Sequence, residues 1–254
     1  MDVEISSRDI SLTFAKGMTV LQAFGESRAR LTLAEIARLT GIERAVTRRL
    51  VLTLVHLGYV RKIENRFSLT PRVLVLGSGF LRGNEFGRVI QPLIEMCARE
   101  LGFSVSLAMR DGQEAVYVAQ SSQQNARYTF GFTLGSRLPI LSTAIGRMLI
   151  AWGDPCWADE MLETAPLQKF TPETLMDRDA IARSVAEIRA QSVAIVRSEF
   201  EAGAVGIAVP VGAPGTAEAA LGISEPLAAL PPDRHRALAE VMHGYARQIA
   251  EALD

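Results

Sequence analysis

The sequence contains few of the residues around which most enzyme and metal centres are built. Three histidines occur in 254 residues, and none of them lies between Leu57 and Arg234. The two cysteines, Cys97 and Cys156, belong to no CxxC motif and to no cluster with histidine. Histidine is central to most zinc sites and hydrolase triads, and two cysteines cannot form a disulfide framework. The sequence therefore predicts no catalytic residue, metal site or cofactor, and it favours buried cysteines in a reducing compartment.

The sequence also lacks a long hydrophobic run and a strong net charge. Its longest uncharged stretch, residues 202–217, is interrupted by two prolines and several glycines, and the formal net charge is -1. A helix that spans a bilayer needs about 20 consecutive apolar residues, so this stretch is too short and too interrupted. Asp2 and Glu4 lie where a signal peptide would carry basic and apolar residues. These features predict a cytoplasmic, globular protein without a membrane partner.

The first 70 residues read as three helices followed by a small hairpin. Apolar residues at helical spacing predict a first helix over residues 12–24. Thr32, with Glu35 three residues later, has the pattern of a capping box and starts a short second helix that Gly41 ends. A third helix is predicted over residues 43–57, and a basic hairpin over residues 59–69 follows it. Helix, glycine turn, helix and basic hairpin are the layout of a winged helix-turn-helix.

The third helix predicts the DNA-reading surface. Arg44, Thr47, Arg48 and Val51 recur at i, i+3, i+4 and i+7, opposite an apolar face. Two arginines, a hydroxyl and a small apolar group can read base edges in a major groove. Flanking groups are expected to contact phosphates, including the N–H groups at the helix start that Thr32 caps. The predicted DNA-binding residues are Thr32, Arg44, Thr47, Arg48, Arg49, Arg61, Lys62 and Arg66.

The charge is divided unevenly along the chain. Residues 1–82 contain 13 basic and 7 acidic residues, whereas the remainder contains 14 basic and 21 acidic residues. The two parts therefore carry charges of +6 and -7, although the whole chain is nearly neutral. A basic segment joined to an acidic one is typical of a DNA-binding head with a second domain behind it.

The rest of the chain alternates helices with strands. Helical patterns cover residues 89–101 and 143–152, part of 171–191, and a terminal helix that Pro231 opens. Strand patterns cover residues 105–109, 115–119, 127–134, 193–197, 205–211 and 219–224. Strands enclosed by helices predict an α+β domain around an antiparallel sheet. The expected division is a DNA-binding domain over residues 1–70, a linker helix over 71–84 and a second domain over 85–254.

Several segments resemble the IclR family of transcriptional regulators. The resemblance lies in residues 33–42, 48–50, 54–60, 67–74, 135–139 and 143–147. It implies a GAF-like effector domain, and a homodimer or homotetramer that binds a pseudo-palindromic operator. Within the family the chain is most similar to the branch that controls protocatechuate, p-hydroxybenzoate and β-ketoadipate catabolism. One departure is Glu43, where the family commonly has a serine cap; a glutamate suits the helix dipole but repels phosphate.

A binding site for a small organic acid is expected in the second domain. Ser142 and Thr143 lie at a predicted helix start, where free N–H groups and small residues favour a carboxylate. The resemblance adds Ala144, Ile145, Ala204, Gly206, Gly222 and Ser224. The two glycines replace larger family residues and suggest space for an aromatic ring.

Aromatic and charged side chains near these segments could complete the site. Tyr128, with Phe130 and Phe132, could stack on a ring, although Tyr128 and Phe130 suit a core equally well. Arg127, Arg137 or Arg147 could pair with the carboxylate, and Arg137 could instead tie its own loop. Glu199 could accept a hydrogen bond from a hydroxyl, or lie on an exposed turn.

The sequence as a whole predicts a DNA-binding regulator that responds to a small organic acid, with an aromatic acid favoured. The effector would change the placement of the DNA-binding heads or their contact with RNA polymerase. Two other classes stay open: an enzyme with a winged-helix docking domain, and a protein-interaction adaptor. The lack of a phosphate loop, a GxSxG motif and a metal-ligand spacing argues against the enzyme.

Overall fold

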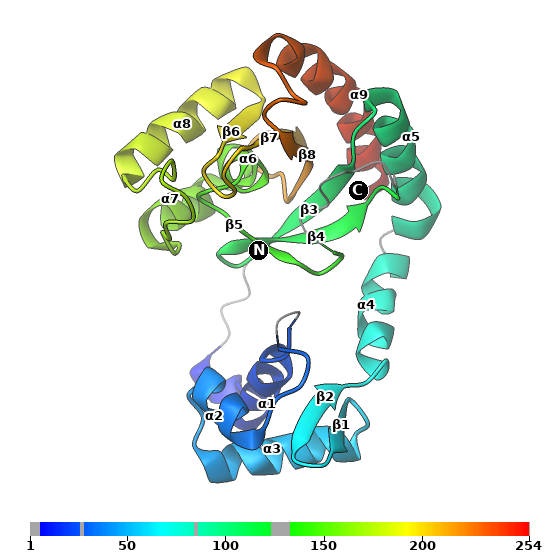
Figure 1. Cartoon of the computed structure of the whole chain (residues 1–254), viewed down its shortest axis with the longest axis vertical. Helices are drawn as coiled ribbons and strands as arrows, with labels where there is room; N and C mark the ends of the chain where they lie inside the picture. The colour runs from blue at the N-terminus through cyan, green and yellow to red at the C-terminus, as the bar shows by residue number, and fades with distance from the viewer. Residues whose placement is uncertain (1–5, 26–27, 84–85, 123–132, 254) are drawn as a thin grey trace. The chain divides into compact units, whose positions relative to one another are not determined.

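A computed structural model of the chain describes residues 6–25, 28–83, 86–122 and 133–253. The chain divides into two compact units between Phe80 and Leu81 (Figure 1). Each unit has its own apolar core. No helix among the described residues is both long enough and apolar enough to cross a membrane.

The first unit is a winged helix-turn-helix, as the sequence predicts. Its core gathers apolar residues from the helices and the hairpin, among them Val20, Ile36 and Phe67. The two strands of the hairpin pair antiparallel. The elements are η1 (Ser7–Asp9), α1 (Leu12–Gln22), α2 (Leu33–Thr40), α3 (Arg44–His56), β1 (Val60–Ile63), β2 (Arg66–Leu69) and α4 (Arg72–Gly83), whose last turn passes into the second unit.

Local hydrogen bonds and a glycine set the two ends of α2. The Glu35 N–H donates to Thr32 Oγ1 at 3.3 Å, and the Thr32 N–H donates to Glu35 Oε2 at 2.7 Å. These hydrogen bonds complete the predicted capping box, and the bonds from Thr32 lower the pKa of Glu35. Gly41 ends α2 in the left-handed conformation, with φ +66°. A short, well-capped helix and a glycine turn therefore lead directly into α3.

The second unit is built on a six-stranded antiparallel sheet with strand order β5-β4-β3-β8-β7-β6. The helices α5 and α9 pack on one face of the sheet, and α6 packs on the other face, where α8 in turn packs against α6. The predicted α+β class is confirmed. The elements are η2 (Phe86–Ile90), α5 (Gln91–Leu101), β3 (Val105–Asp111), β4 (Glu114–Gln120), β5 (Arg137–Pro139), α6 (Ala144–Trp152), α7 (Pro155–Thr164), α8 (Arg178–Gln191), β6 (Ala194–Arg197), β7 (Ala204–Val211), β8 (Ala219–Pro226), η3 (Pro232–Arg234) and α9 (His235–Leu253).

A few elements differ from the sequence prediction. The predicted strand over residues 127–134 falls almost wholly outside the described residues, and β5 is the strand that pairs with β4 on the side away from β3. The helix α7 was not predicted; the Asp154 side chain caps it and Pro155 opens it. A 3-10 turn follows Pro231, so the terminal helix begins at His235. Cys97 is buried as predicted, but Cys156, in the first turn of α7, is exposed.

Candidate functional site

The inner face of α3 differs from the predicted one. Thr47 and Val51 are fully buried together with Leu50, whereas Val46 and Leu54 are only half-buried. Thr47 Oγ1 donates to the Ile42 carbonyl at 3.1 Å, so its hydroxyl is satisfied and its methyl group can pack in the core. The predicted stripe is therefore wrong at Thr47 and Val51, neither of which lies on the outer surface of the helix.

The outer face of α3 carries the exposed arginines. Arg44, Arg48 and Arg49 are exposed, and no described carboxylate forms an ion pair with any of them. A shallow groove runs along the helix and is lined by Glu43, Ala45, Val46, Arg48, Arg49, Leu52, Thr53 and His56. The Glu43 carboxylate accepts from the Ala45 and Val46 N–H groups, so the helix start is capped by its own side chain. The surface thus combines unpaired guanidinium groups with apolar and hydroxyl groups.

The hairpin carries the other predicted contacts. Arg61 Nε donates to Ser68 Oγ at 3.1 Å, and Arg66 Nη1 donates to the Arg30 carbonyl at 3.3 Å. Lys62 is exposed, with no partner among the residues that the structure describes. The Thr32 side chain and N–H are both engaged in the capping box. Any phosphate contact at the start of α2 would therefore use the N–H groups that follow Thr32.

A cavity of about 90 Å³ lies in the second unit, between the sheet and the start of α6. It brings together every predicted effector residue that the structure describes; Tyr128 lies outside the described residues. The predicted residues that line it are Ser142, Thr143, Ala144, Ile145, Glu199, Ala204, Gly206, Gly222 and Ser224.

The start of α6 presents hydrogen-bond donors to this cavity. Thr143 caps the helix by accepting from the Gly146 N–H at 3.1 Å. Within the described part of the chain, no acceptor binds the N–H groups of Ala144 and Ile145. Ser142 is only 2% exposed as a residue, and its hydroxyl forms no hydrogen bond with another described residue. An anion in the cavity would therefore meet two amides and a hydroxyl.

The two glycines of the cavity have a different role from the predicted one. A Cβ atom on Gly206 would lie 3.2 Å from Ala144 Cβ, and one on Gly222 would lie 2.7 Å from Ile145 Cγ1. The space above both glycines is thus already occupied by the first turn of α6. The prediction that they leave room for an aromatic ring is wrong, since they allow the helix start to approach the sheet closely.

No arginine, lysine or histidine is among the described residues that line the cavity. Arg137 pairs with Asp111 and Glu114, which favours the alternative that it ties its own loop. Arg147 is buried against Glu199, so Glu199 does not lie on an exposed turn. Arg127 lies outside the described residues. Burial raises the pKa of Glu201 and of Glu225, both of which line the cavity.

Some residues of the cavity were not predicted. Ser106 on β3 lies opposite Gly222 on β8 and Gln120 on β4, and its side chain is 9% exposed. Strand alternation could have placed Ser106 on one face of the sheet, but only the register between strands places it beside Gly222. The unpredicted lining residues are Ser104, Ser106, Tyr117, Gln120, Leu138, Val196, Ser198, Phe200, Glu201, Ile223 and Glu225.

Comparisons with known proteins agree on the family. Residues 13–64 match the model described as the IclR helix-turn-helix domain, and residues 80–251 match the model described as the bacterial transcriptional regulator IclR C-terminal domain. The Pca regulon regulatory protein of Pseudomonas putida is 34% identical over 85% of this chain and 75% of its own length. The p-hydroxybenzoate hydroxylase transcriptional activator of Acinetobacter baylyi is 34% identical over 82% of this chain and 78% of its own length. An IclR homologue from Microbacterium hydrocarbonoxydans, solved in complex with 4-hydroxybenzoate, superimposes with a TM-score of 0.77 at 26% identity, covering 95% of this chain and 98% of its own.

Proposed function

Because the chain belongs to the IclR family of bacterial transcriptional regulators, we propose that its first unit binds a pseudo-palindromic operator and its second unit binds a small aromatic acid. The observation that carries the effector proposal is the cavity at the start of α6, which the residues Ser142, Ala144 and Ile145 line. The comparisons support an aromatic acid, since one relative is named as the activator of p-hydroxybenzoate hydroxylase and a homologue was solved in complex with 4-hydroxybenzoate. These relatives are named as regulators. We propose that this chain is also a regulator, that it acts in the cytoplasm, and that it catalyses no reaction.

We propose that the effector carboxylate binds at the N-terminus of α6. We propose that neutral donors receive the negative charge, since no cationic side chain is among the described residues that line the cavity. The amides of Ala144 and Ile145 and the hydroxyl of Ser142 are suited to this, and the helix dipole adds to their effect. The aromatic ring would then lie against Tyr117, Leu138 and Phe200.

The size of the cavity suggests how binding could be signalled. A cavity of about 150 Å³ holds benzene, whereas this one measures about 90 Å³. An aromatic acid therefore requires a wall of the cavity to move. We propose that this movement links effector binding to operator binding.

Removing one amide donor tests the carboxylate site. Ala144 is the first residue of α6, where proline is well accepted, and Thr143 before it is extended (φ -121°, ψ 152°), as proline requires. Ala144→Pro should weaken binding of an aromatic acid by about 10- to 100-fold, because a hydrogen bond to a charged group is lost. Isothermal titration with 4-hydroxybenzoate, 3,4-dihydroxybenzoate and benzoate measures this.

Two controls accompany that experiment. Ala144→Gly keeps the amide and should bind within about threefold of the unaltered protein. The uncharged 4-hydroxybenzamide should bind at least about tenfold more weakly than the acid. Equal affinity for acid and amide, or failure of all three acids to bind the unaltered protein, would contradict the proposed effector class.

We propose that the protein forms a homodimer through exposed apolar faces of α1 and α4. Leu12 and Phe14 on α1 are 69% and 70% exposed, and Leu74 on α4 is 70% exposed. Exposed apolar residues gathered on an element of a small unit commonly mark an interaction surface. A two-fold dimer also matches a pseudo-palindromic operator.

Charged substitutions test these faces. Phe14→Asp and Leu74→Asp together should shift the protein to a monomer in light scattering, because each places a carboxylate in an apolar contact. Met96→Asp on α5, where Met96 is also exposed, is the matched control and should leave the mass unchanged. A variant that keeps the mass of the unaltered oligomer would show that other surfaces hold the chains together.

A further inference from the structure

A buried ion pair lies beside the cavity. Arg147, on α6, is 2% exposed, and Glu199, in the loop between β6 and β7, is 8% exposed. Arg147 Nη1 and Nη2 donate to the two carboxylate oxygens of Glu199 at 2.7 and 2.6 Å. Burying two charges is costly, and such a pair is often no more stabilising than two apolar side chains. Its bidentate geometry does fix the relative orientation of the two segments that the pair joins.

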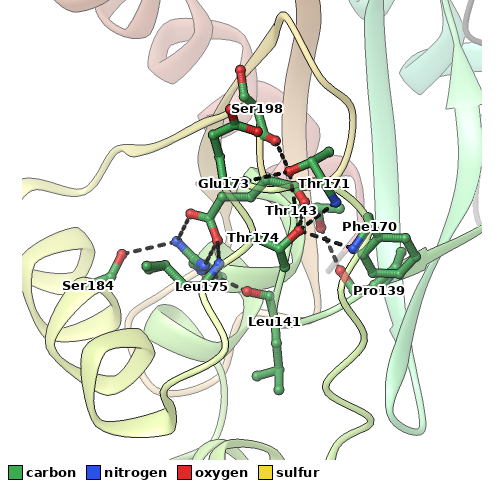
Figure 2. Close-up of polar contacts among 12 residues, drawn as sticks. Pro139, Leu141, Thr143, Phe170, Thr171, Glu173, Thr174, Leu175, Ser184 and Ser198 are labelled. Carbon is green, nitrogen blue, oxygen red and sulfur yellow. Dashed lines mark hydrogen bonds and ion pairs between the residues drawn. The ribbon is translucent and has the colours of Figure 1, made fainter.

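Arg147 connects the pair to the segment that leads into α6. Its Nε donates to the Leu141 carbonyl at 2.8 Å, and its Nη1 lies 3.5 Å from Ser184 Oγ (Figure 2). Leu141 immediately precedes Ser142, which lines the cavity. One guanidinium group therefore holds the approach to the helix start and the opposite loop. Because these donors are already engaged, the Arg147 guanidinium holds the 198–203 loop and does not pair with the carboxylate of an effector.

Glu199 connects the pair to a third segment. Its Oε2 accepts from the Leu175 N–H at 3.0 Å, and its carbonyl accepts from Thr174 Oγ1 at 2.6 Å. The neighbouring Ser198 carbonyl accepts from Thr171 Oγ1 at 2.5 Å. Figure 2 shows Thr171, Thr174 and Leu175 gathered around this loop. The segment 171–175 therefore also supports the 198–203 loop, through hydrogen bonds to Ser198 and Glu199.

The 198–203 loop needs such support. Ser198 has φ +55°, a left-handed conformation that is unfavourable for a residue other than glycine and persists only where its surroundings hold it. Ser198, Glu199, Phe200 and Glu201 all line the cavity. The loop is thus a wall of the cavity, and the pair joins it to the opposite wall at α6.

We propose that Arg147 and Glu199 are positioning residues of the effector site, which hold the 198–203 loop against the start of α6. The inference rests on the proposed function, since it takes the cavity as the effector site. Arg147 has a second effect: it neutralises a carboxylate that would otherwise repel an anionic effector. The pair shapes the site without contacting the effector carboxylate.

Amide hydrogen exchange of the full chain tests the proposal. Arg147→Met combined with Glu199→Met replaces the pair by apolar side chains, so the protein is expected to stay folded. The amides of Ser198, Gly203 and Ala204 form hydrogen bonds within the loop and should exchange at least about tenfold faster. The β7 amides beyond Ala204 should keep their protection. Arg236→Met with Glu240→Met, which removes an exposed ion pair on α9, is the control and should change neither set.

The outcomes are decisive in either direction. A folded double variant whose loop amides exchange as in the unaltered protein overturns the proposal. If the double variant does not fold, amide exchange of Arg147→Lys provides the same test, since lysine keeps the charge but cannot form the bidentate pair. Binding of 4-hydroxybenzoate should also weaken by about tenfold or more in the double variant. If the unaltered protein binds none of the three acids, the proposed effector class fails, whereas the exchange result still decides the role of the pair.

Discussion

Alanine at both Arg48 and Arg49 is expected to weaken specific operator binding by at least about 30-fold and to remove most of the base preference. Both side chains are exposed on the outer face of α3, and neither is paired with a described carboxylate. An arginine that contacts a base contributes about 1–3 kcal/mol to specific binding, so the loss of two is large. Fluorescence anisotropy with the DNA upstream of the gene, and with the same fragment scrambled, measures both effects.

Two further variants separate base reading from other causes. Thr47→Val alters the predicted stripe at a buried position, so it should lower stability by about 1 kcal/mol without changing base preference. Lys62→Ala should weaken binding to both fragments equally and reduce its salt dependence, as expected for a phosphate contact. Unchanged operator affinity in the double arginine variant would remove α3 as the reading helix.

The helix and its arginines were predictable, but the rotation of the helix was not. The charged residues of α3 stand out in the sequence, and the neighbouring caps and glycine turns follow local rules. Threonine is ambiguous in such a pattern, since its methyl group suits a core and its hydroxyl suits a surface. At Thr47 the Ile42 carbonyl satisfies the hydroxyl, which lets the residue turn inward. A contact of this kind depends on how α3 packs, so the periodicity alone cannot reveal it.

Only part of the lining of the effector cavity was predicted from the sequence. The resemblance supplied the residues of α6, β7 and β8, whereas Ser106 and Tyr117 come from strands whose register no motif records. The partner of Arg147 was also not predicted, since Glu199 lies 52 residues further along the chain. The explanation offered for Gly206 and Gly222 failed for a related reason. A glycine shows that something comes close to the backbone, but only the fold shows whether a ligand or a helix does so.

That close approach leads to the second large effect, at Gly146 in the first turns of α6. A Cβ atom there would lie 2.5 Å from Ile140 Cα and even closer to the Ile140 carbonyl oxygen. Since these are backbone atoms, no side-chain rotation can relieve the overlap. Gly146→Ala should therefore lower the free energy of unfolding by about 3 kcal/mol or more, measured by urea denaturation of the full chain.

Gly244 in α9 provides a matched comparison, because a Cβ atom there meets nothing within 4 Å. Gly244→Ala should raise the free energy of unfolding by about 0.5–1 kcal/mol, the usual gain for alanine over glycine inside a helix. The two substitutions are chemically identical and both lie in helices, so the opposite signs would isolate the contact with Ile140. To relieve the overlap, α6 must move away from the segment 140–141, which carries the Ala144 and Ile145 amides out of place. Gly146→Ala should thus lose aromatic-acid binding even where it remains folded. A stable variant with undiminished binding would show that Ile140 does not hold the start of α6 closely.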